Sequence, residues 1–361
     1  MAFSFIKKLR SINFNFFTSD LGVDLGTSNV LIYVEGKGVV IREPCVVAVD
    51  KNSGNILQVG ADARNMMGRT PGNVVAMKPL TNGIISDHEM TVRMLSAMFK
   101  AAAKSGLLTP KPRVVISVPS GITEVEERNV INAAIEAGAR RVFLIEEPLA
   151  SGLGAGLDLS GAKGHMVVDI GGGTTNIAVL SMNGVVLSSS LRIAGDAFDA
   201  AIARYVRRNY NMVIGQVTAE AVKINLGRVY PGGEELQMEV KGRDAKTGSP
   251  RVEIMSSNEI FEVLQRLALN IADEVTDVLS QTSPELVGDI AETGITLTGG
   301  CAQMPGMAEL IMEKTRIPVV VADDPASCTA YGCGKSLAWI NNMQEGPINI
   351  ARKRMMRSTQ Q

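Results

Sequence analysis

The sequence predicts an α/β fold made of two similar domains. Three observations lead to this class. The chain has 361 residues, which is more than one typical core organises. Short runs rich in Val, Ile and Leu alternate with helical segments, as in sheets covered by helices. One strand-turn-strand pattern also occurs twice, near Asp24 and again near Asp169, a separation of 145 residues (169 minus 24).

The composition describes a globular protein without a general affinity for nucleic acid. Hydrophobic residues make up 45% and charged residues 20% of the chain, and the net charge is -1, so any attraction of polyanions must be local. Four cysteines occur without metal spacing, which predicts buried free thiols and a reducing compartment. Only two histidines are present, which argues against a histidine-rich metal site and most histidine-based triads.

Residues 1–17 predict a membrane-binding segment. Read as a helix, they place Phe5, Leu9, Ile12 and Phe16 on one face with cations beside it and no acid, a pattern typical of an interfacial anchor. A disordered tail, or a tail packed on the body, is the alternative. The chain lacks an apolar run long enough for a spanning helix, so none is expected.

From residue 21 onward the sequence predicts strands, a small insertion and a helix. Residues 21–49 are rich in Val, Ile and Leu and are broken by glycine turns, which favours successive antiparallel strands. Residues 51–80 are polar and punctuated by Gly and Pro, which indicates a small inserted subdomain. From 90 to 103 the apolar spacing becomes helical, and its methionines are expected to fill the core.

Residues 112–151 predict a strand, a helix, a second strand and the start of another helix. Thr123 and Glu126 form the T-x-x-E pattern of a capping box, and Gly138 is a natural stop for the helix between the two strands. Strands joined by helices of this length form parallel sheets covered by helices.

Both copies of the repeat carry a glycine-containing turn after an acid, D-L-G-T-S-N at 24–29 and D-I-G-G-G-T-T-N at 169–176. Either turn alone is ambiguous, because glycine also serves an ordinary hairpin. A loop without side chains can bring its N–H groups to a phosphate, and hydroxyls add donors. Two such loops predict one phosphate chain held between two domains, with Asp24 and Asp169 facing a magnesium ion.

The later segments predict a second insertion and a third glycine turn. Residues 218–227 are expected to form a helix, 235–257 a two-stranded excursion and 257–281 a long amphipathic helix. The strand at 294–298 ends in two glycines, a point of close backbone approach suited to a nucleoside.

Five segments resemble the actin, Hsp70 and sugar-kinase ATPase superfamily, and most closely the MreB family of bacterial actin homologues. These segments are VDLGTSNVLIYVEGKGVV, PRVVISVPSGIT, RRVFLIEEPLAS, VVDIGGGTTNIAVLS and ELVGDIAETGITLTGG. The resemblance covers residues 20–345. It implies an actin-like ATPase fold with two duplicated RNase H-like domains, each with a smaller inserted subdomain and with the nucleotide in the cleft between them. The implied pieces are a membrane-binding segment 1–17, domain I at 18–160 plus 332–350 with its small subdomain about 48–80, domain II at 161–331 with its small subdomain about 198–261, and a basic tail 351–361.

The resemblance also implies the cofactors ATP and Mg²⁺ and the residues that hold them. The implied ATP-binding residues are Asp24, Gly26, Thr27, Ser28, Asn29, Asp169, Gly171, Gly172, Gly173, Thr174, Thr175, Glu220, Lys223, Gly299 and Gly300. In this assignment the two loops bind the phosphates, and Asp24 and Asp169 serve the magnesium ion through its waters. Glu220 and Lys223 line the ribose and base.

Glu147 is implied as the group that positions the attacking water, with help from Thr174. The alternative for Glu147 is an exposed residue that caps the helix begun by Pro148, and this capping role is the one expected for Glu146. The sequence departs from the family pattern at Cys301, where a third glycine is usual, and at Asn176, where an acid is usual. The departure at Cys301 lies where the resemblance places the adenosine of ATP. The departure at Asn176 lies near the second phosphate loop and bears on hydrolysis.

The resemblance implies a cell-shape-determining cytoskeletal ATPase with slow turnover, whose subunits form filaments that organise cell-wall elongation. Its expected place is the cytoplasm, at the inner face of the cell membrane. The expected partners are further copies in paired protofilaments, membrane lipid and membrane proteins of the elongation machinery, but not nucleic acid. Leu107 and Leu108 match a second apolar membrane contact of the family, while residues 351–361 are expected to be a solvated tail, with lipid contact as the alternative.

Two other functions are compatible with the superfamily. A sugar or acetate-type kinase would need a catalytic base and a substrate pocket in place of the water site, and no additional acid motif for that role is evident. A chaperone would need a peptide-binding domain after the ATPase, near the point where this chain ends.

Overall fold

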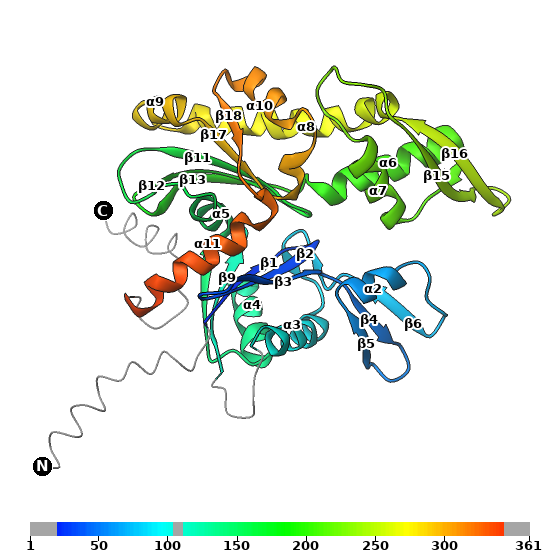
Figure 1. The fold of residues 1–361 in the computed structure, drawn as a ribbon, viewed down its shortest axis with the longest axis horizontal. Coiled ribbons are helices and arrows are strands. Elements are labelled where there is room, and N and C mark those ends of the chain that lie inside the picture. Colours follow the sequence, from blue (N-terminus) through cyan, green and yellow to red (C-terminus); the bar gives the residue numbers. More distant parts are fainter. Residues whose placement is uncertain (1–19, 104–110, 343–361) are drawn as a thin grey trace, which may run out of the picture.

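The computed structural model describes residues 20–103 and 111–342 (Figure 1). Two five-stranded sheets have the same topology, in the orders β10-β9-β1-β2-β3 and β13-β12-β11-β17-β18. In each sheet three strands form an antiparallel meander, and two parallel strands extend it beyond the first strand of the meander. The predicted duplicated α/β fold is therefore confirmed.

The first sheet is covered by two helices, α3 (His88–Ala103) and α4 (Glu124–Glu136). Its strands are β1 (Leu21–Leu25), β2 (Asn29–Val34), β3 (Gly38–Pro44), β9 (Arg113–Val118) and β10 (Arg141–Glu146). The methionines of α3 are buried in this core, as predicted. The capping box at α4 is also present, because Glu126 N donates to Thr123 Oγ1 at 3.3 Å and Thr123 N donates to Glu126 Oε2 at 2.7 Å.

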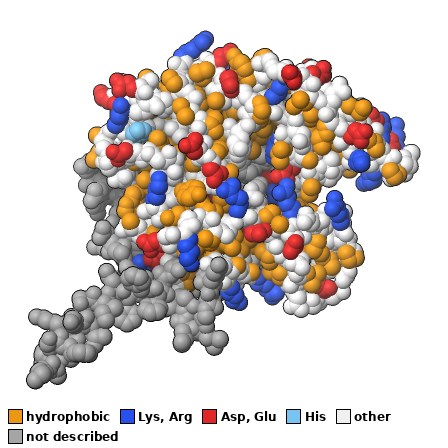
Figure 2. All heavy atoms as spheres, viewed as in Figure 1, with side chains coloured by type: hydrophobic (Ala, Val, Ile, Leu, Met, Phe, Trp, Pro, Cys, Tyr) orange, Lys and Arg blue, Asp and Glu red, His pale blue; other side chains and the backbone are white. Residues whose placement is uncertain are grey.

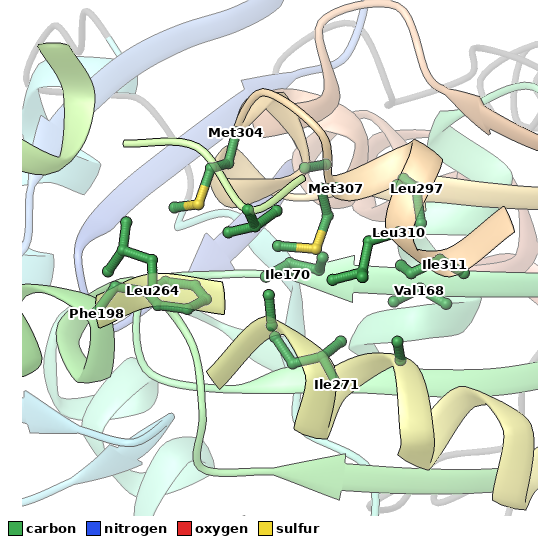
Figure 3. Packing of buried hydrophobic residues seen from close by; sticks show 14 of the residues in the cluster. Val168, Ile170, Phe198, Leu264, Ile271, Leu297, Met304, Met307, Leu310 and Ile311 are labelled. Carbon is green, nitrogen blue, oxygen red and sulfur yellow. The ribbon is translucent and has the colours of Figure 1, made fainter. Parts of the chain in front are cut away.

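The second sheet carries the larger core. Its strands are β11 (His165–Ile170), β12 (Thr175–Ser181), β13 (Gly184–Leu191), β17 (Ile295–Thr298) and β18 (Val319–Val321). The helices that share its core include α6 (Gly195–Tyr210), α8 (Ser257–Gln281), α9 (Pro284–Thr293) and α10 (Met307–Thr315). Figure 3 shows side chains of β11 and β17 packed against residues of α6, α8 and α10.

Helix α8 spans the residues predicted for the long amphipathic helix. Its buried residues recur every three or four positions, from Ile260 through Leu264 and Ala268 to Val278, which places them on one face. At its first turn Glu259 N donates to the hydroxyl of Ser256 at 3.4 Å.

Each large sheet is accompanied by a small three-stranded sheet. One contains β4 (Val47–Asp50), β5 (Ile56–Val59) and β6 (Val74–Met77) beside α2 (Ala61–Met66), and the other β14 (Met212–Val213), β15 (Gln237–Asp244) and β16 (Pro250–Ser256) beside α7 (Gln216–Leu226). Both lie at the same end of the molecule (Figure 1). The two-stranded excursion is confirmed, and the division into domains stays a prediction.

Helices α5 (Glu147–Gly154) and α11 (Cys328–Ser336) form a layer between the large sheets (Figure 1). They touch backbone to backbone, because a Cβ at Gly332 would overlap the carbonyl of Ala150. Around them Val115 and Phe143 of the first sheet share a core with Val167 of the second. This packing fixes the two sheets against each other.

Short elements complete the described chain. They are the pair β7 (Leu80–Thr81) and β8 (Ile84–Ile85) and the 3₁₀ helices η2 (Gly300–Gln303), η3 (Pro325–Ser327) and η4 (Leu337–Asn342). Within residues 20–103 and 111–342, no helix combines the length and the apolar character that crossing a membrane requires.

Candidate functional site

The first glycine turn joins β1 to β2. Asp24 lies near the end of β1 and pairs with Leu31, so the turn between them is short. A Cβ at Gly26 would lie 2.8 Å from the carbonyl oxygen of Asn29, which explains why the tight turn needs glycine there. Thr27 Oγ1 accepts a hydrogen bond from Gly83 N at 2.7 Å, which ties the turn to the β7–β8 hairpin.

The second glycine turn joins β11 to β12 at the equivalent place in the other sheet. Gly171 N donates to the carbonyl oxygen of Thr174 at 3.0 Å and closes the turn. The first residues of α6 also bond to this turn. Gly195 N donates to the carbonyl oxygen of Gly171 at 3.2 Å, and Asp196 N donates to that of Gly172 at 2.7 Å. The turn is therefore fixed by backbone bonds before any ligand binds.

The two turns touch each other. A Cβ at Gly172 would lie 2.6 Å from Cβ of Ser28, and one at Gly173 would lie 2.5 Å from Oγ1 of Thr27. Larger residues at either glycine would force the turns apart. The glycines thus allow loops from two different sheets to meet at one point, as the phosphate hypothesis requires.

Both turns open into a cavity of about 230 Å³. Its lining includes these predicted residues: Asp24, Gly26, Thr27, Ser28, Asn29, Glu147, Asp169, Gly171, Gly172, Gly173, Thr174, Glu220, Lys223, Gly299 and Gly300. Thr175 is the exception, since it is fully buried and its hydroxyl donates to the carbonyl oxygen of Ile193 at 2.6 Å. Successive side chains of a strand point to opposite faces, so Thr175 faces away from the cavity that Thr174 lines.

Three carboxylates converge on the cavity. Burial and the charge of Asp169 raise the pKa of Asp24 to about 7, although Ser117 Oγ donates to Asp24 Oδ1 at 3.2 Å. Burial raises the pKa of Asp169 to about 6, and Thr329 Oγ1 donates to its Oδ2 at 3.1 Å. Burial and the charges of both aspartates raise the pKa of Glu147 well above its usual range. The site therefore favours a cation.

The melting temperature of the ligand-free protein is expected to rise as the pH falls from about 8 to about 5. The folded state raises the pKa of Asp24 to about 7 and of Asp169 to about 6, from 3.8. Folding then binds protons, and the resulting stability is lost as the pH rises through these values. Thermal melts monitored by circular dichroism check this. Asp24→Asn, which carries no charge at any of these pH values, should flatten the profile, and an unchanged slope in that variant would contradict the assignment.

Glu147 is only 8% exposed, so the alternative of an exposed helix cap is wrong for this residue. Asn176 Nδ2 donates to its Oε2 at 2.6 Å. Glu146 occupies the N-cap position of α5, as expected, but its side chain makes no capping bond. Its carboxylate accepts from Ser120 Oγ at 2.8 Å instead, because β10 directs it toward the loop after β9.

The opposite wall of the cavity is built from α7 and η2. Lys223 Nζ lies 2.9 Å from Asp199 Oδ1 and donates to the carbonyl oxygen of Gly195 at 3.3 Å. Glu220 forms an ion pair with Arg64 of α2. Cys301 also lines the cavity, so the departure from glycine does present a side chain to this wall.

The boundary between the two small sheets is the open side of the molecule. In Figure 2 the surface is hollowed between the β4–β6 region and the α6–β16 region, and charged side chains of both signs gather there. The ion pairs at this boundary include Lys78 with Asp196, at 2.8 Å between Nζ and Oδ1. Together with the Arg64–Glu220 pair, the Lys78–Asp196 pair connects the region of the first insertion to α6 and α7.

The donor set of the site fits Mg²⁺ held through water. Oxygen ligands from carboxylates suit this ion, which usually keeps several of its waters and binds phosphates. Within residues 20–103 and 111–342, no three His, Cys, Asp or Glu side chains approach closely enough to hold a metal directly. Beside burial, the charges of Asp169 and Asp24 raise the pKa of Glu147, so a positive charge among the three carboxylates would relieve this repulsion.

Some predicted residues lie outside the described part of the chain. These are Phe5, Leu9, Ile12, Phe16, Leu107 and Leu108 and the basic residues from 351 onward. The membrane predictions that rest on them therefore stay predictions.

Sequence reasoning missed several residues that hold the site together. Ser117, Thr329 and Asp199 each bond to a predicted residue across a long stretch of chain. None belongs to a glycine motif, so no local signal marks them. Asn176 was noted only as a departure from the family pattern, although it contacts Glu147 directly.

The doubled sheet and the cavity between its copies define an actin-like fold. The solved structure of MreB5 of Spiroplasma citri bound to AMPPNP matches with a TM-score of 0.85 at 36% identity, over 90% of this chain and 97% of that chain. A MamK double helical filament shares the fold, with a TM-score of 0.75 at 24% identity over 88% of this chain and 98% of that one.

The family follows from the sequence comparisons. The MreB/Mbl protein family model matches residues 18–345. The cell shape-determining protein MreB of Escherichia coli strain K12 is 49% identical over 340 residues, covering 93% of this chain and 97% of that protein. The cell shape-determining protein Mbl of Bacillus subtilis is 45% identical over 331 residues, with 92% and 98% covered. The chain belongs to the MreB/Mbl family. None of the relatives named here is a small-molecule kinase.

Proposed function

We propose that this chain is a cell-shape-determining cytoskeletal ATPase that binds Mg²⁺ and ATP in the cavity between the two sheets and assembles into filaments on the membrane. The observation that carries the proposal is the contact of the two glycine turns, Gly172 against Ser28 and Gly173 against Thr27, in front of three carboxylates. A triphosphate spanning both turns would join the two halves of the molecule. The match to a relative solved with AMPPNP supports this ligand.

In the proposed reaction the chain supplies position and hydrogen bonds. N–H groups of both turns face the phosphates, and Glu147 accepts a hydrogen bond from the attacking water and takes its proton. The water oxygen bonds to the γ-phosphorus while the bond to the β–γ bridging oxygen breaks, so inorganic phosphate forms and ADP leaves with that oxygen. Mg²⁺, held through water by Asp24 and Asp169, would supply the positive charge that offsets the phosphates.

Nucleotide state and assembly are coupled in this proposal. The turns belong to different sheets, so ATP favours one relative orientation of the two halves and its hydrolysis weakens that preference. Identical subunits that join head to tail by a rotation that does not close form open filaments. Such filaments, together with lipid and membrane proteins of the elongation machinery, would organise wall synthesis at the inner face of the cell membrane.

Phosphate release and electron microscopy test the function together. The protein is incubated with Mg²⁺ and ATP on a lipid monolayer, with ADP and no-lipid samples as controls. We expect slow phosphate release, and filaments with ATP that are fewer or absent with ADP. Isolated monomers and no phosphate release under every condition would overturn the proposal.

Membrane contact gives a separate prediction. Deleting residues 2–17, or changing Leu107 and Leu108 to Ser, is expected to weaken co-sedimentation with anionic liposomes while leaving nucleotide binding intact, because two weak apolar insertions add. The matched control is Val125→Ser with Ile135→Ser, which removes two exposed apolar residues of α4. If both variants sediment like the unchanged chain, the membrane assignment is wrong.

A further inference from the structure

Asn176 occupies an unusual position for an amide. Every residue of β12 is buried, and Asn176 itself is 1% exposed. Its backbone pairs with Asp169 of β11, which places it beside the acids of the cavity without lining it. From there its Nδ2 donates to Glu147 Oε2 at 2.6 Å and lies 3.5 Å from Thr174 Oγ1.

The amide of Asn176 turns its NH₂ end toward Glu147, which accepts the hydrogen bond through Oε2. The other end, Oδ1, is buried and finds no hydrogen-bond partner among the residues that the structure describes. A buried acceptor without a partner destabilises the fold, whereas an apolar side chain in this strand would not. The hydrogen bond to Glu147 is what an amide adds here in return for the unpaired Oδ1.

An amide also differs chemically from a carboxylic acid at this position. A neutral amide donates whatever the pH, whereas a carboxylic acid donates only when it carries a proton. Asn176 therefore occupies one oxygen of Glu147 permanently. The other carboxylate oxygen of Glu147 is Oε1, and the Glu147 side chain lines the cavity.

We propose that Asn176 is the positioning residue for Glu147: its amide holds Oε2, so that Oε1 is the oxygen offered to the attacking water. This inference rests on the proposed function. It assigns to Asn176 an effect on the chemical step through Glu147, with no contact to the nucleotide.

The test is a double-mutant cycle on phosphate release by the full chain with Mg²⁺ and ATP. Asn176→Ala is expected to lower kcat by about tenfold or more, while the ATP dissociation constant changes by less than about twofold. In the background of Glu147→Ala it should change nothing further, because the group it positions is gone. Asn176→Val, which refills most of the volume, should show the same loss of kcat with a melting temperature close to that of the unchanged chain.

Ser181→Ala is the matched control. Ser181 is another buried polar residue of β12, and its hydroxyl donates to the carbonyl oxygen of Ala162 at 2.9 Å, away from Glu147. Its loss should leave kcat unchanged.

Three results would overturn the inference alone: an unchanged kcat in both Asn176 variants, an equal further loss in the Glu147→Ala background, or variants too unstable to fold, which would make the residue structural. An unchanged rate in Glu147→Ala would remove the water-positioning role from Glu147, and the inference with it. Absence of phosphate release and of filaments with the unchanged chain would instead overturn the proposed function.

Discussion

Replacing Glu147 with glutamine is expected to lower the rate of phosphate release by a factor of about 10² or more while leaving ATP binding nearly unchanged. Glutamine has the same shape and can still accept from Asn176 through its carbonyl oxygen. Its other end is then an NH₂ group, which cannot accept a hydrogen bond from the water or take its proton. The expected loss is thus specific to the chemical step.

Single-turnover phosphate release and equilibrium binding of a fluorescent ATP analogue separate the two effects. The matched control is Glu146→Gln, at the neighbouring acid, which bonds to Ser120 and does not line the cavity. We expect that control to retain the rate within about twofold. If Glu147→Gln hydrolyses ATP at the unchanged rate, another group orients the water.

Replacing Gly299 with alanine is expected to destabilise the protein and to impair nucleotide binding. Gly299 has φ 84° and ψ 159°, a conformation open essentially to glycine. A Cβ there would overlap Asp169 Oδ1 and lie 2.6 Å from the carbonyl carbon of Ile170. Backbone strain and overpacking together should lower the free energy of unfolding by about 2–5 kcal/mol.

The neighbouring glycine provides the control. A Cβ at Gly300 meets no atom within 4 Å, and its φ is not positive, so Gly300→Ala should keep the melting temperature of the ligand-free protein. Chemical denaturation of both variants measures the difference, and titration with ATP shows whether displacement of Asp169 weakens binding. Equal stability of the two variants would show that the turn after β17 adapts more freely than its geometry indicates.

Much of the architecture could be predicted from local patterns. The repeat around Asp24 and Asp169 predicted the duplicated sheets, because similar strand-turn-strand sequences fold into similar meanders. The T-x-x-E pattern at Thr123 predicted the start of α4, since capping uses only groups within one turn. Fourteen of the fifteen residues that the family resemblance implied for ATP line one cavity, and Thr175 does not, because the alternation of β12 turns it to the other face.

Contacts between distant residues could not be predicted in this way. Asn176 and Glu147 are 29 positions apart, and Thr329 and Asp169 are 160 apart. Sequence periodicity says which face of an element is buried, but not which element it meets. The capping role expected for the side chain of Glu146 failed for this reason, because its partner Ser120 comes from the loop after a different strand.

By itself the sequence determined the order of strands and helices, the duplication, the two glycine turns and the family. The tertiary structure decided that the turns touch, that Glu147 is buried beside Asn176, and that three acids with raised pKa values share one cavity. The physical reason is the layer of α5 and α11, whose backbones meet at Gly332 and fix one sheet against the other. Burial and the distances between charges follow from that packing, and no local stretch of sequence contains them.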